Sequence, residues 1–420
     1  MKPTLMLVGG ARPLLAFSVD LTEAVLAQAA ARGVRTLVTS TASDLAAMPS
    51  IVASADEAAA VGFTEPGETA EWARRRVAAG EHIVAVLAQL EMAQVAAAET
   101  AEAVGAPGNA PEVIRRIRTK DACRAALAAA GFAQPAVRLC ASAADAAGFL
   151  RETAGPWIVK PRDAMGSTGV SQISSADDLP AALALLPDAG TFLVEEFVSG
   201  PEFSVEGIFQ RGRPRILAVT AKETVPPPFF VETAHTLPAD LPEPRRREID
   251  ETVSAALLAL GLRSGAFHAE IWLTPTGVVL GEVHSRFGGD WIHKMLEYAI
   301  PGIELFGLII DDLLGLPQTP GPLEPTRGAA VRYLTPPPGQ VVTIEGWDEV
   351  LAHPAVLHAE LSAGPGTDIP PLHRSGDRVG LIVVGARTST LARELAEELA
   401  SSVRFVTTSD EAMVKGSAGA

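Results

Sequence analysis

The stretch that decides the fold is FHAEIWLTPTGVVLGEVHSR, residues 267–286. Apolar and polar residues alternate on both sides of the central Pro-Thr-Gly, which predicts two antiparallel strands joined by a three-residue loop. A loop of that length would place Glu270 directly opposite Glu282. Alternation along the strands would then put His268 and His284 on the same face of the sheet as these two carboxylates.

Two like charges that face each other across a hairpin destabilise it, unless a cation lies between them. Carboxylates at this separation suit Mg²⁺, which prefers oxygen ligands. The alternative is an exposed acidic face, and Trp272 on the same face makes that alternative less attractive. Gly288 and Gly289 follow shortly before a predicted helix, where backbone amides can approach an anion. The segment therefore predicts a metal site beside an anion site.

Two earlier segments carry weaker signals. Lys160 ends the apolar run that begins at Trp157, and a lysine in a buried strand needs a partner. The following loop, residues 163–170, is rich in Gly, Ser and Thr and could close over phosphates, although a plain surface loop fits equally well. It does not contain the P-loop sequence. Residues 192–206 read as a strand that ends in acids, turns at Gly-Pro and re-enters a strand, which by itself is an ordinary hairpin.

The first 110 residues alternate short apolar runs with alanine-rich stretches. This alternation predicts a parallel sheet covered by helices. The expected strands are 5–8, 36–38 and 83–87, and the expected helices are 21–31, 70–79 and 93–104. The glycines after the first strand do not form a dinucleotide-binding fingerprint. One further helix is expected over 111–130.

Composition excludes several classes of protein. The chain has 420 residues and a net charge of −16, which argues against a nucleic-acid partner. No apolar run is long enough to span a membrane, so no membrane partner is expected. The two cysteines cannot form a disulfide framework, which suits a reducing compartment and a cytoplasmic location. Only six of the 34 basic residues are lysines, so a lysine inside a motif is less readily explained as a generic surface charge.

The motifs, in this order and spacing, resemble the ATP-grasp superfamily, and within it the bacterial carboxylate–amine ligases that join amino acids. The motifs are Val-Lys-Pro at 159–161, Gly-Ser-Thr-Gly at 166–169, Val-Glu-Glu-Phe-Val-Ser-Gly-Pro-Glu-Phe-Ser-Val-Glu at 194–206 and Glu-Val-x-x-Arg-x-Gly-Gly-Asp at 282–290. The resemblance implies an ATP-grasp fold of α/β and α+β type. It also implies a parallel-sheet N-terminal domain (1–110), a central domain with the phosphate-covering loop (111–208), a lobe with the metal site (209–325), a β-rich C-terminal subdomain (326–412) and a disordered tail (413–420).

The resemblance also implies roles for individual residues. Two phosphate-binding lysines, the phosphate-covering loop, an adenine-binding hinge and a ribose-binding acid correspond to Lys120, Lys160, Gly166, Ser167, Thr168, Glu195, Glu196, Val198 and Glu202. The metal ligands correspond to Glu270, Glu282 and His284. The catalytic groups correspond to Arg286, Lys222 and His268. The family often has asparagine where this chain has His284, and a neutral imidazole is a poorer magnesium ligand, so that residue either binds metal weakly or positions substrate.

The implied activity uses ATP and Mg²⁺, with Mn²⁺ as an alternative. A substrate carboxylate attacks the γ-phosphate to give an acyl-phosphate, and an amine then displaces phosphate to form an amide. Small amino-acid-like molecules are the expected substrates, and a homodimer is the expected assembly where the chain follows its relatives. The alternatives are a carboxylase-type ligase that activates bicarbonate, a ligase that acts on a ribosyl-phosphate amine, and a nucleotide-binding protein without catalysis.

Overall fold

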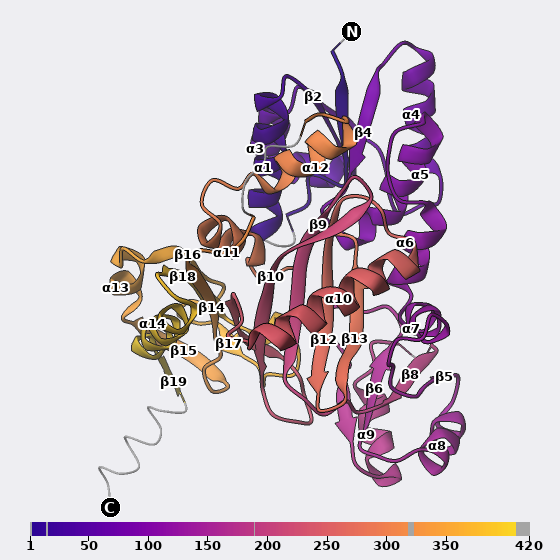
Figure 1. The fold of residues 1–420 in the computed structure, drawn as a ribbon. Coiled ribbons are helices and arrows are strands. Elements are labelled where there is room, and N and C mark those ends of the chain that lie inside the picture. Colours follow the sequence, from indigo (N-terminus) through magenta and orange to yellow (C-terminus); the bar gives the residue numbers. More distant parts are fainter. Residues whose placement is uncertain (1, 14–15, 189, 318–322, 409–420) are drawn as a thin grey trace, which may run out of the picture.

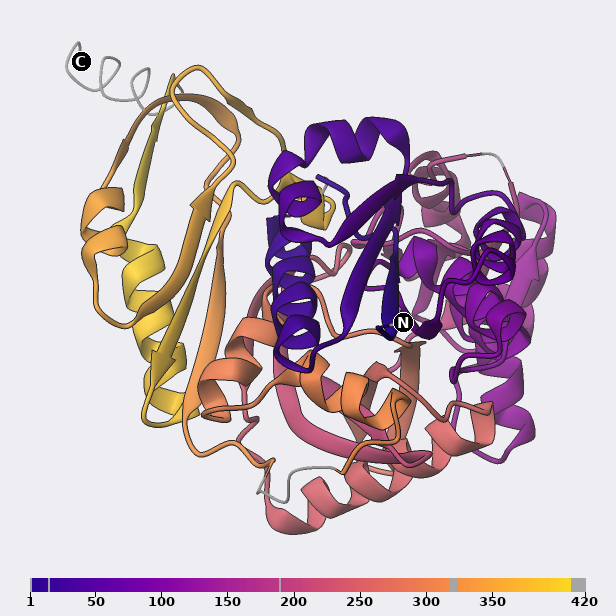
Figure 2. The same ribbon diagram turned by 90° about the horizontal axis from the view of Figure 1, so that it is seen from above.

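A computed structural model describes residues 2–13, 16–188, 190–317 and 323–408. These residues form four sheets, with the N-terminal layer beside the central lobes and the C-terminal elements in a lobe to one side (Figures 1 and 2). The expected tail, 413–420, lies outside the described residues. Among the described residues, no helix has the length and apolar character needed to cross a membrane.

The N-terminal layer is a parallel sheet, as predicted, and its strand order is β3-β2-β1-β4. Its elements are β1 (Thr4–Val8), α1 (Ala16–Ala31), β2 (Arg35–Ser40), α2 (Ala42–Ala47), α3 (Pro49–Ser54), β3 (Glu57–Ala60), α4 (Glu68–Ala78), β4 (Ile83–Leu87) and α5 (Gln94–Val104). Every residue of β1 is fully buried because helices cover both faces of the sheet. The sequence did not predict β3, since a Glu followed by three alanines carries neither alternation nor β-branched residues.

The single helix expected over 111–130 is wrong in one respect, because two helices occupy that region. They are α6 (Pro111–Arg118) and α7 (Lys120–Ala129). Between them Thr119 has an extended backbone, and its hydroxyl donates to the carbonyl of Arg115. The break places Lys120 in the first turn of a new helix and turns it toward the central lobes. Helical periodicity cannot reveal such a break when no Gly or Pro marks it.

The central lobe holds a small antiparallel sheet with strand order β5-β8-β6-β7. Its elements are β5 (Val137–Cys140), α8 (Ala143–Glu152), β6 (Trp157–Pro161), β7 (Ser171–Ile173), α9 (Leu179–Ala184) and β8 (Phe192–Glu196). Trp157 and Val159 pack into the core of this lobe. The alternate residues Ile158 and Lys160 therefore point to the opposite face, where a cavity lies.

An eight-stranded sheet runs through the rest of the chain in the order β13-β12-β9-β10-β11-β14-β18-β16. Its strands are β9 (Glu202–Gln210), β10 (Arg213–Thr224), β11 (Glu232–Leu237), β12 (Ala266–Thr274), β13 (Gly277–His284), β14 (Gly328–Leu334), β16 (Val356–Leu361) and β18 (Gly380–Ala386). The pairing of β11 with β14 carries the sheet from the lobe with the hairpin into the C-terminal subdomain. The predicted domain division stays a prediction.

Helices cover this large sheet, and a second small sheet closes the C-terminal subdomain. The helices are α10 (Glu243–Leu260), α11 (Ile292–Ala299), α12 (Leu305–Leu313), α13 (Trp347–Ala352) and α14 (Ser389–Ser402). The small sheet has the order β17-β15-β19, formed by β17 (Asp368–Ile369), β15 (Gly339–Glu345) and β19 (Arg404–Thr407). The helix α10 lies across one face of the sheet (Figure 1), over the core that contains Ala269 and Ile271.

The hairpin of β12 and β13 corrects the predicted turn. Thr274 pairs with Gly277, so the loop contains two residues and not three. A β-bulge between the partners of Ala269 and Ile271 then inserts one extra residue, so that His268 pairs with His284 as predicted. Register at the site is therefore restored by the bulge, whose glycine at 281 leaves no room for a side chain beside the Glu270 backbone.

The core beneath the cavity depends on two aromatic rings. Phe209 and Phe267 are fully buried and meet edge to face, with ring centroids 5.6 Å apart. A side chain at Gly207 would meet the Phe267 ring at 2.2 Å, so the ring occupies the space that this glycine leaves. Ala269 and Ile271, which alternate with Glu270 along β12, belong to the same core, so the face of the hairpin opposite the carboxylates is buried.

Truncation of Phe267 therefore tests this core. We expect Phe267→Ala to lower the free energy of unfolding by about 3–5 kcal/mol, because it removes a buried ring and leaves a cavity. Chemical denaturation followed by far-UV circular dichroism measures the change. The matched control is Leu351→Ala, at a residue that is 54% exposed, and it should change stability by less than about 0.5 kcal/mol. Equal effects of the two variants would contradict this account of the core.

Candidate functional site

A cavity of about 380 Å³ lies between the central sheet and the eight-stranded sheet. Most of the predicted site residues line it, although they come from separate parts of the chain. These residues are Lys120, Lys160, Gly166, Ser167, Glu195, Glu196, Val198, Glu202, Lys222, Glu270 and Glu282. Four predicted residues do not line it: Thr168, His268, His284 and Arg286.

The deep end of the cavity contains a buried cluster of two cations and one carboxylate. Arg124 donates to both oxygens of Glu195, at 2.5 and 2.9 Å, and the Lys160 ammonium lies 2.9 Å from the second oxygen. Burial would raise the pKa of Glu195, but the charges of Lys160 and Arg124 outweigh it and lower that pKa to about 2. The Glu195 side chain is therefore an anion that holds Lys160 in place, and the predicted place of its backbone in the adenine-binding hinge stays a prediction.

Lys222 occupies the centre of a second buried cluster. Its ammonium lies 2.6 Å from Glu202, 3.2 Å from Glu270 and 3.4 Å from Glu232. Burial would lower the pKa of Lys222, but the three carboxylates raise it well above its usual value. Burial raises the pKa of Glu202 against the opposing effect of Lys222. The predicted ribose-binding acid and the predicted metal ligand therefore share one cation.

His268 lies between two carboxylates, Glu206 and Glu270. Its Nδ1 lies 2.8 and 3.0 Å from the two oxygens of Glu206, and its Nε2 lies 3.8 Å from Glu270. Burial would lower the pKa of His268, but the Glu206 carboxylate outweighs it and raises that pKa to about 9. Glu206 is fully buried and also accepts from Ser204. His268 is not among the residues that line the cavity, and it contacts the predicted metal ligand Glu270; its predicted catalytic role stays a prediction.

Lys120 reaches the cavity from the first turn of α7. Its ammonium donates to the carbonyl of Ala164 at 2.9 Å and lies 3.4 Å from Glu282. Burial would lower the pKa of Lys120, but Glu282 and Glu91 raise it. The lysine thus contacts both the glycine-bearing loop and the second predicted metal ligand.

The N-terminal layer contributes Glu91, just after β4. One of its oxygens lies 2.9 Å from His284 Nδ1 and accepts from Arg286 at 2.6 and 3.0 Å. Burial would raise the pKa of Glu91, but His284 and Arg286 lower it well below its usual value. The Nε2 of His284 lies 3.7 Å from Glu282, so this ring faces the acid and a small neighbouring cavity that also contains Lys120.

The loop at 163–170 lies against the cavity in a conformation that needs positive φ at three positions, Gly166, Ser167 and Gly169. The Ser167 hydroxyl donates to the carbonyl of Phe230 at 3.1 Å. Thr168 does not line the cavity. The cavity also has an apolar part, which is lined by Ile158, Met165, Val198 and Phe230. A flat aromatic base can pack between such groups.

The cavity suits a divalent cation that is bound partly by the protein. Glu270 and Glu282 both line it, and Mg²⁺ typically takes one or two carboxylates together with waters and substrate phosphates. No group of three or more His, Cys, Asp or Glu side chains that could hold a metal occurs among the residues that the structure describes. The two carboxylates fit a magnesium ion that is completed by phosphate oxygens.

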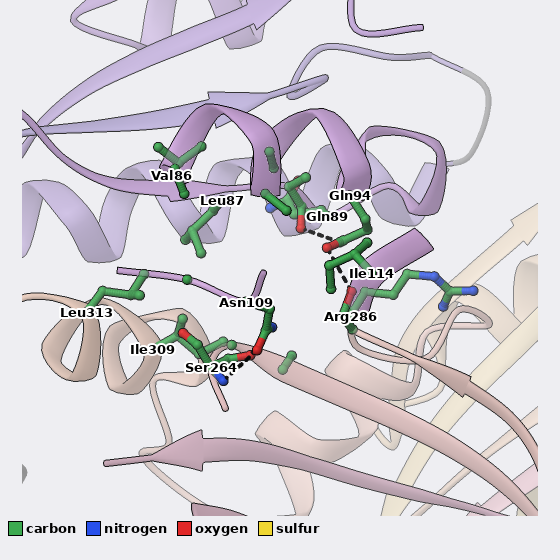
Figure 3. Close-up of a pocket in the computed structure, with 18 of the residues that line it drawn as sticks. Val86, Leu87, Gln89, Gln94, Asn109, Ile114, Ser264, Arg286, Ile309 and Leu313 are labelled. Carbon is green, nitrogen blue, oxygen red and sulfur yellow. Dashed lines mark hydrogen bonds between the residues drawn. The ribbon is translucent and has the colours of Figure 1, made fainter. Parts of the chain in front are cut away.

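A second cavity, of about 70 Å³, lies between the N-terminal layer and the large sheet (Figure 3). Val86, Leu87, Ile309 and Leu313 supply apolar walls. The guanidinium of Arg286 points away from the other labelled residues in Figure 3, consistent with its pairing to Glu91. This cavity lacks the lysines and the acids of the first one and does not belong to the same site.

Four charged residues of the site were missed in the sequence: Glu91, Arg124, Glu206 and Glu232. Two of them carried a usable signal. Arg124 follows Lys120 by four residues, which places both on one face of a helix. Glu91 follows the carboxyl end of a parallel strand, where ligands commonly bind in such sheets. Glu206 and Glu232 are recognisable only once their strands lie beside β10 and β12.

Neither cysteine is suited to act as a nucleophile. Burial raises the pKa of the Cys123 thiol to about 12 and that of the Cys140 thiol to about 11. Both thiols are buried and free. They stay protonated at neutral pH and are poor nucleophiles in that form.

Two protein families and a solved structure match this chain. Residues 153–294 match the ATP-grasp domain family, and residues 332–408 match the family "L-amino acid ligase C-terminal domain 2". The structure resembles that of the L-amino acid ligase from Bacillus licheniformis with a TM-score of 0.80, at 21% identity, over 97% of this chain and 100% of the other. The fold is therefore the ATP-grasp fold.

Two curated relatives show sequence similarity over part of the chain. Protein y4rH of Sinorhizobium fredii is 29% identical over 71% of this chain, and the alanine–anticapsin ligase of Bacillus amyloliquefaciens is 27% identical over 51%. The alignments span 63% and 51% of the lengths of these two proteins.

The buried pair of His268 and Glu206 predicts a pH-dependent contribution to stability. The pKa of His268 rises from 6.5 to about 9 on folding, which corresponds to about 3 kcal/mol. Because the folded pKa is raised, this stabilisation is complete below pH 6.5 and disappears as the pH rises through about 9. We expect the difference in unfolding free energy between the wild type and the double variant His268→Gln, Glu206→Gln to shrink by about that amount between pH 6 and pH 10.

Denaturation with urea at a series of pH values measures this difference. The control variant is Leu351→Ala, at a residue that is 54% exposed and carries no titratable group. Its difference from the wild type should be the same at every pH. A difference for the double variant that is constant from pH 6 to pH 10 would refute the ion pair.

Proposed function

We propose that this chain, an ATP-grasp protein by its fold and its matched domains, is an ATP-dependent carboxylate–amine ligase. The observation that carries the proposal is the composition of the 380 Å³ cavity, where three lysines and six glutamates, among them the two predicted metal ligands, lie beside apolar side chains. Lys120, Lys160 and Lys222 supply positive charge for a triphosphate. Glu270 and Glu282 supply the oxygen ligands of the magnesium ion that accompanies it.

The chemistry follows from charge neutralisation and positioning. An oxygen of the substrate carboxylate attacks the γ-phosphorus, the bond to the bridging oxygen breaks, and ADP leaves. The nitrogen of the amine then attacks the acyl carbon, phosphate leaves, and the amine loses a proton to give an amide. The lysines hold the phosphate oxygens in line and neutralise their charge. Arg286 has the planar donors that bind a carboxylate through two hydrogen bonds.

Each predicted cofactor-binding residue takes a part in this proposal. Gly166, Ser167 and Thr168 belong to the loop that covers the phosphates, and Glu195, Glu196 and Val198 belong to the segment beside the adenine. Glu202, which accepts a hydrogen bond from Lys222, would bind the ribose hydroxyls. The bound Mg²⁺, or Mn²⁺ in its place, would neutralise charge on the β- and γ-phosphates. His284 would orient Glu282 and Glu91 and would not itself bind the metal.

The substrates we propose are small amino acids. Two features support this choice: the match of residues 332–408 to a domain of L-amino acid ligases, and the similarity to an alanine–anticapsin ligase. A homodimer and a cytoplasmic location complete the proposal. Both follow from the resemblance and from the composition of the chain, and size-exclusion chromatography with light scattering tests the first of them.

The proposal is tested by measuring ADP and phosphate release with Mg-ATP and a panel of amino acids, singly and in pairs, with product masses. We expect release to require both a carboxylate and an amine, and a product mass equal to their sum less one water. Glu282→Gln should lower kcat/KM by about 10²–10³-fold, because one negative charge on the metal is lost. The control is Glu223→Gln, next to Lys222 on β10 but paired with Arg332 and 43% exposed, which should retain activity.

Other outcomes would overturn the proposal in recognisable ways. Release that depends on bicarbonate would indicate a carboxylase-type ligase, and release that depends on a ribosyl-phosphate amine would indicate a ligase of that class. Binding of ATP without release of phosphate, with every partner in the panel, would indicate a nucleotide-binding protein without this activity.

A further inference from the structure

One residue of the C-terminal subdomain contacts two separate parts of the nucleotide cavity. Ser375 begins a short 3-10 turn, residues Ser375–Asp377. Its backbone N–H donates to the carbonyl of Gly166 at 3.0 Å, in the loop that lines the cavity. Its hydroxyl donates to Glu232 at 2.8 Å. No role in the proposed reaction has so far been assigned to this residue.

The second contact leads directly to the charge cluster. The other oxygen of Glu232 lies 3.4 Å from the ammonium of Lys222, which also contacts Glu202 and Glu270. A single residue therefore connects the 163–170 loop to the carboxylate that contacts Lys222. The loop is also close to Ser375 in its packing, since a side chain at Gly166 would come within 3.6 Å of the Ser375 Cβ.

The turn that carries Ser375 is anchored independently of the loop. Arg378 donates from Nε to the carbonyl of Ser375 at 2.9 Å and from both terminal nitrogens to Asp290, at 3.0 and 3.2 Å. Its guanidinium lies 3.5 Å from the centre of the Tyr333 ring. The Asp290 carboxylate also meets His235 at 3.0 Å. The turn is thus fixed to β11, β14 and the segment after β13, and it provides a rigid support for a loop that needs positive φ at three positions.

We propose that Ser375 is a positioning residue that holds the 163–170 loop closed over the nucleotide and orients Glu232 toward Lys222. The C-terminal subdomain would thereby take part in the reaction. A closed loop excludes water, and an acyl-phosphate that meets water is hydrolysed before the amine can attack. The consequence for the reaction rests on the proposed ligase function, whereas the contact with the loop can be tested without it.

Two variants separate the contacts of Ser375. Ser375→Ala removes only the hydroxyl bond to Glu232. Ser375→Pro also removes the N–H and places a ring where the Gly166 carbonyl now lies. Proline is tolerated in the first position of a helical turn, and the preceding residue, Arg374, already has the extended backbone that a following proline favours. The control is Gly376→Ala in the same turn, because a side chain there meets no atom within 4 Å.

The first measurement is limited proteolysis of the full chain with trypsin, with and without Mg-ATP. Arg162 precedes the loop and its side chain is 41% exposed, so cleavage after Arg162, identified by fragment mass, reports how often the loop opens. We expect Mg-ATP to protect this bond in the wild type and in Gly376→Ala. Ser375→Pro should be cleaved about tenfold faster than either of them in the presence of Mg-ATP, with an unchanged melting temperature.

The second measurement is the ratio of ADP released to amide formed. It should be near one in the wild type and in Gly376→Ala. It should rise at least severalfold in Ser375→Pro, with a higher KM for ATP. Ser375→Ala, which keeps the N–H, should change kcat more than KM, and Ser375→Thr should restore kcat.

Protection by Mg-ATP in Ser375→Pro equal to that in Gly376→Ala would overturn the proposal. If Ser375→Pro does not fold, Ser375→Ala decides, and a kcat equal to that of the wild type would then overturn it. A difference in proteolysis without any ligase activity would support the contact with the loop and reject the proposed function.

Discussion

The structure depends on the requirement that a charge removed from water must have partners. Lys222 is the clearest case, because its ammonium is buried among three carboxylates that belong to β9, β11 and β12. These strands are neighbours of β10 or of each other in the eight-stranded sheet. Removal of one partner would leave an uncompensated charge in a medium of low polarity, which is costly. The register of four strands is therefore coupled to the geometry of the site.

The same requirement explains how the separate lobes meet at one cavity. The central sheet contributes Lys160 and Glu195, and α7 contributes the Arg124 that completes this cluster. The N-terminal layer contributes Glu91, which holds Arg286 and His284 from the large sheet. Each lobe thus supplies charges that the next lobe neutralises. A triphosphate with its metal would enter an environment in which lysines and acids are already oriented, so that little reorganisation accompanies phosphoryl transfer.

The continuity of the large sheet gives the C-terminal subdomain a physical connection to the site. Glu232 lies on β11, and the pairing of β11 with β14 extends the sheet into the C-terminal subdomain. Within that subdomain, Arg378 donates a hydrogen bond to Asp290, which follows β13. Burial would raise the pKa of Asp290, but Arg378 and His235 lower it. Asp290 and Arg378 therefore both stay charged. The contact between the C-terminal subdomain and the segment after β13 is an ion pair.

The sequence by itself determined the class of fold and indicated many of the charged residues that line the cavity. Strand and helix alternation in the first 110 residues, the acids of the hairpin and the isolated lysines all depend on local pattern and chemical type, which a sequence records directly. It could not reveal the two-residue turn and the bulge, because their effects on register cancel at His268. It also could not show that the side chain of Glu195 pairs with Lys160.

Only the tertiary structure decided which charges neutralise one another. Glu91, Arg124 and Glu206 are more than 60 residues away in the chain from the groups that they hold, and Glu232 meets Lys222 only because β10 pairs with β11. The choice of partner for a buried charge depends on the distances between side chains after the sheets have packed, since electrostatic interaction in a protein interior falls with separation and not with distance along the sequence. For this reason local pattern identified the groups that face the cavity, and packing decided which of them are held in place by others.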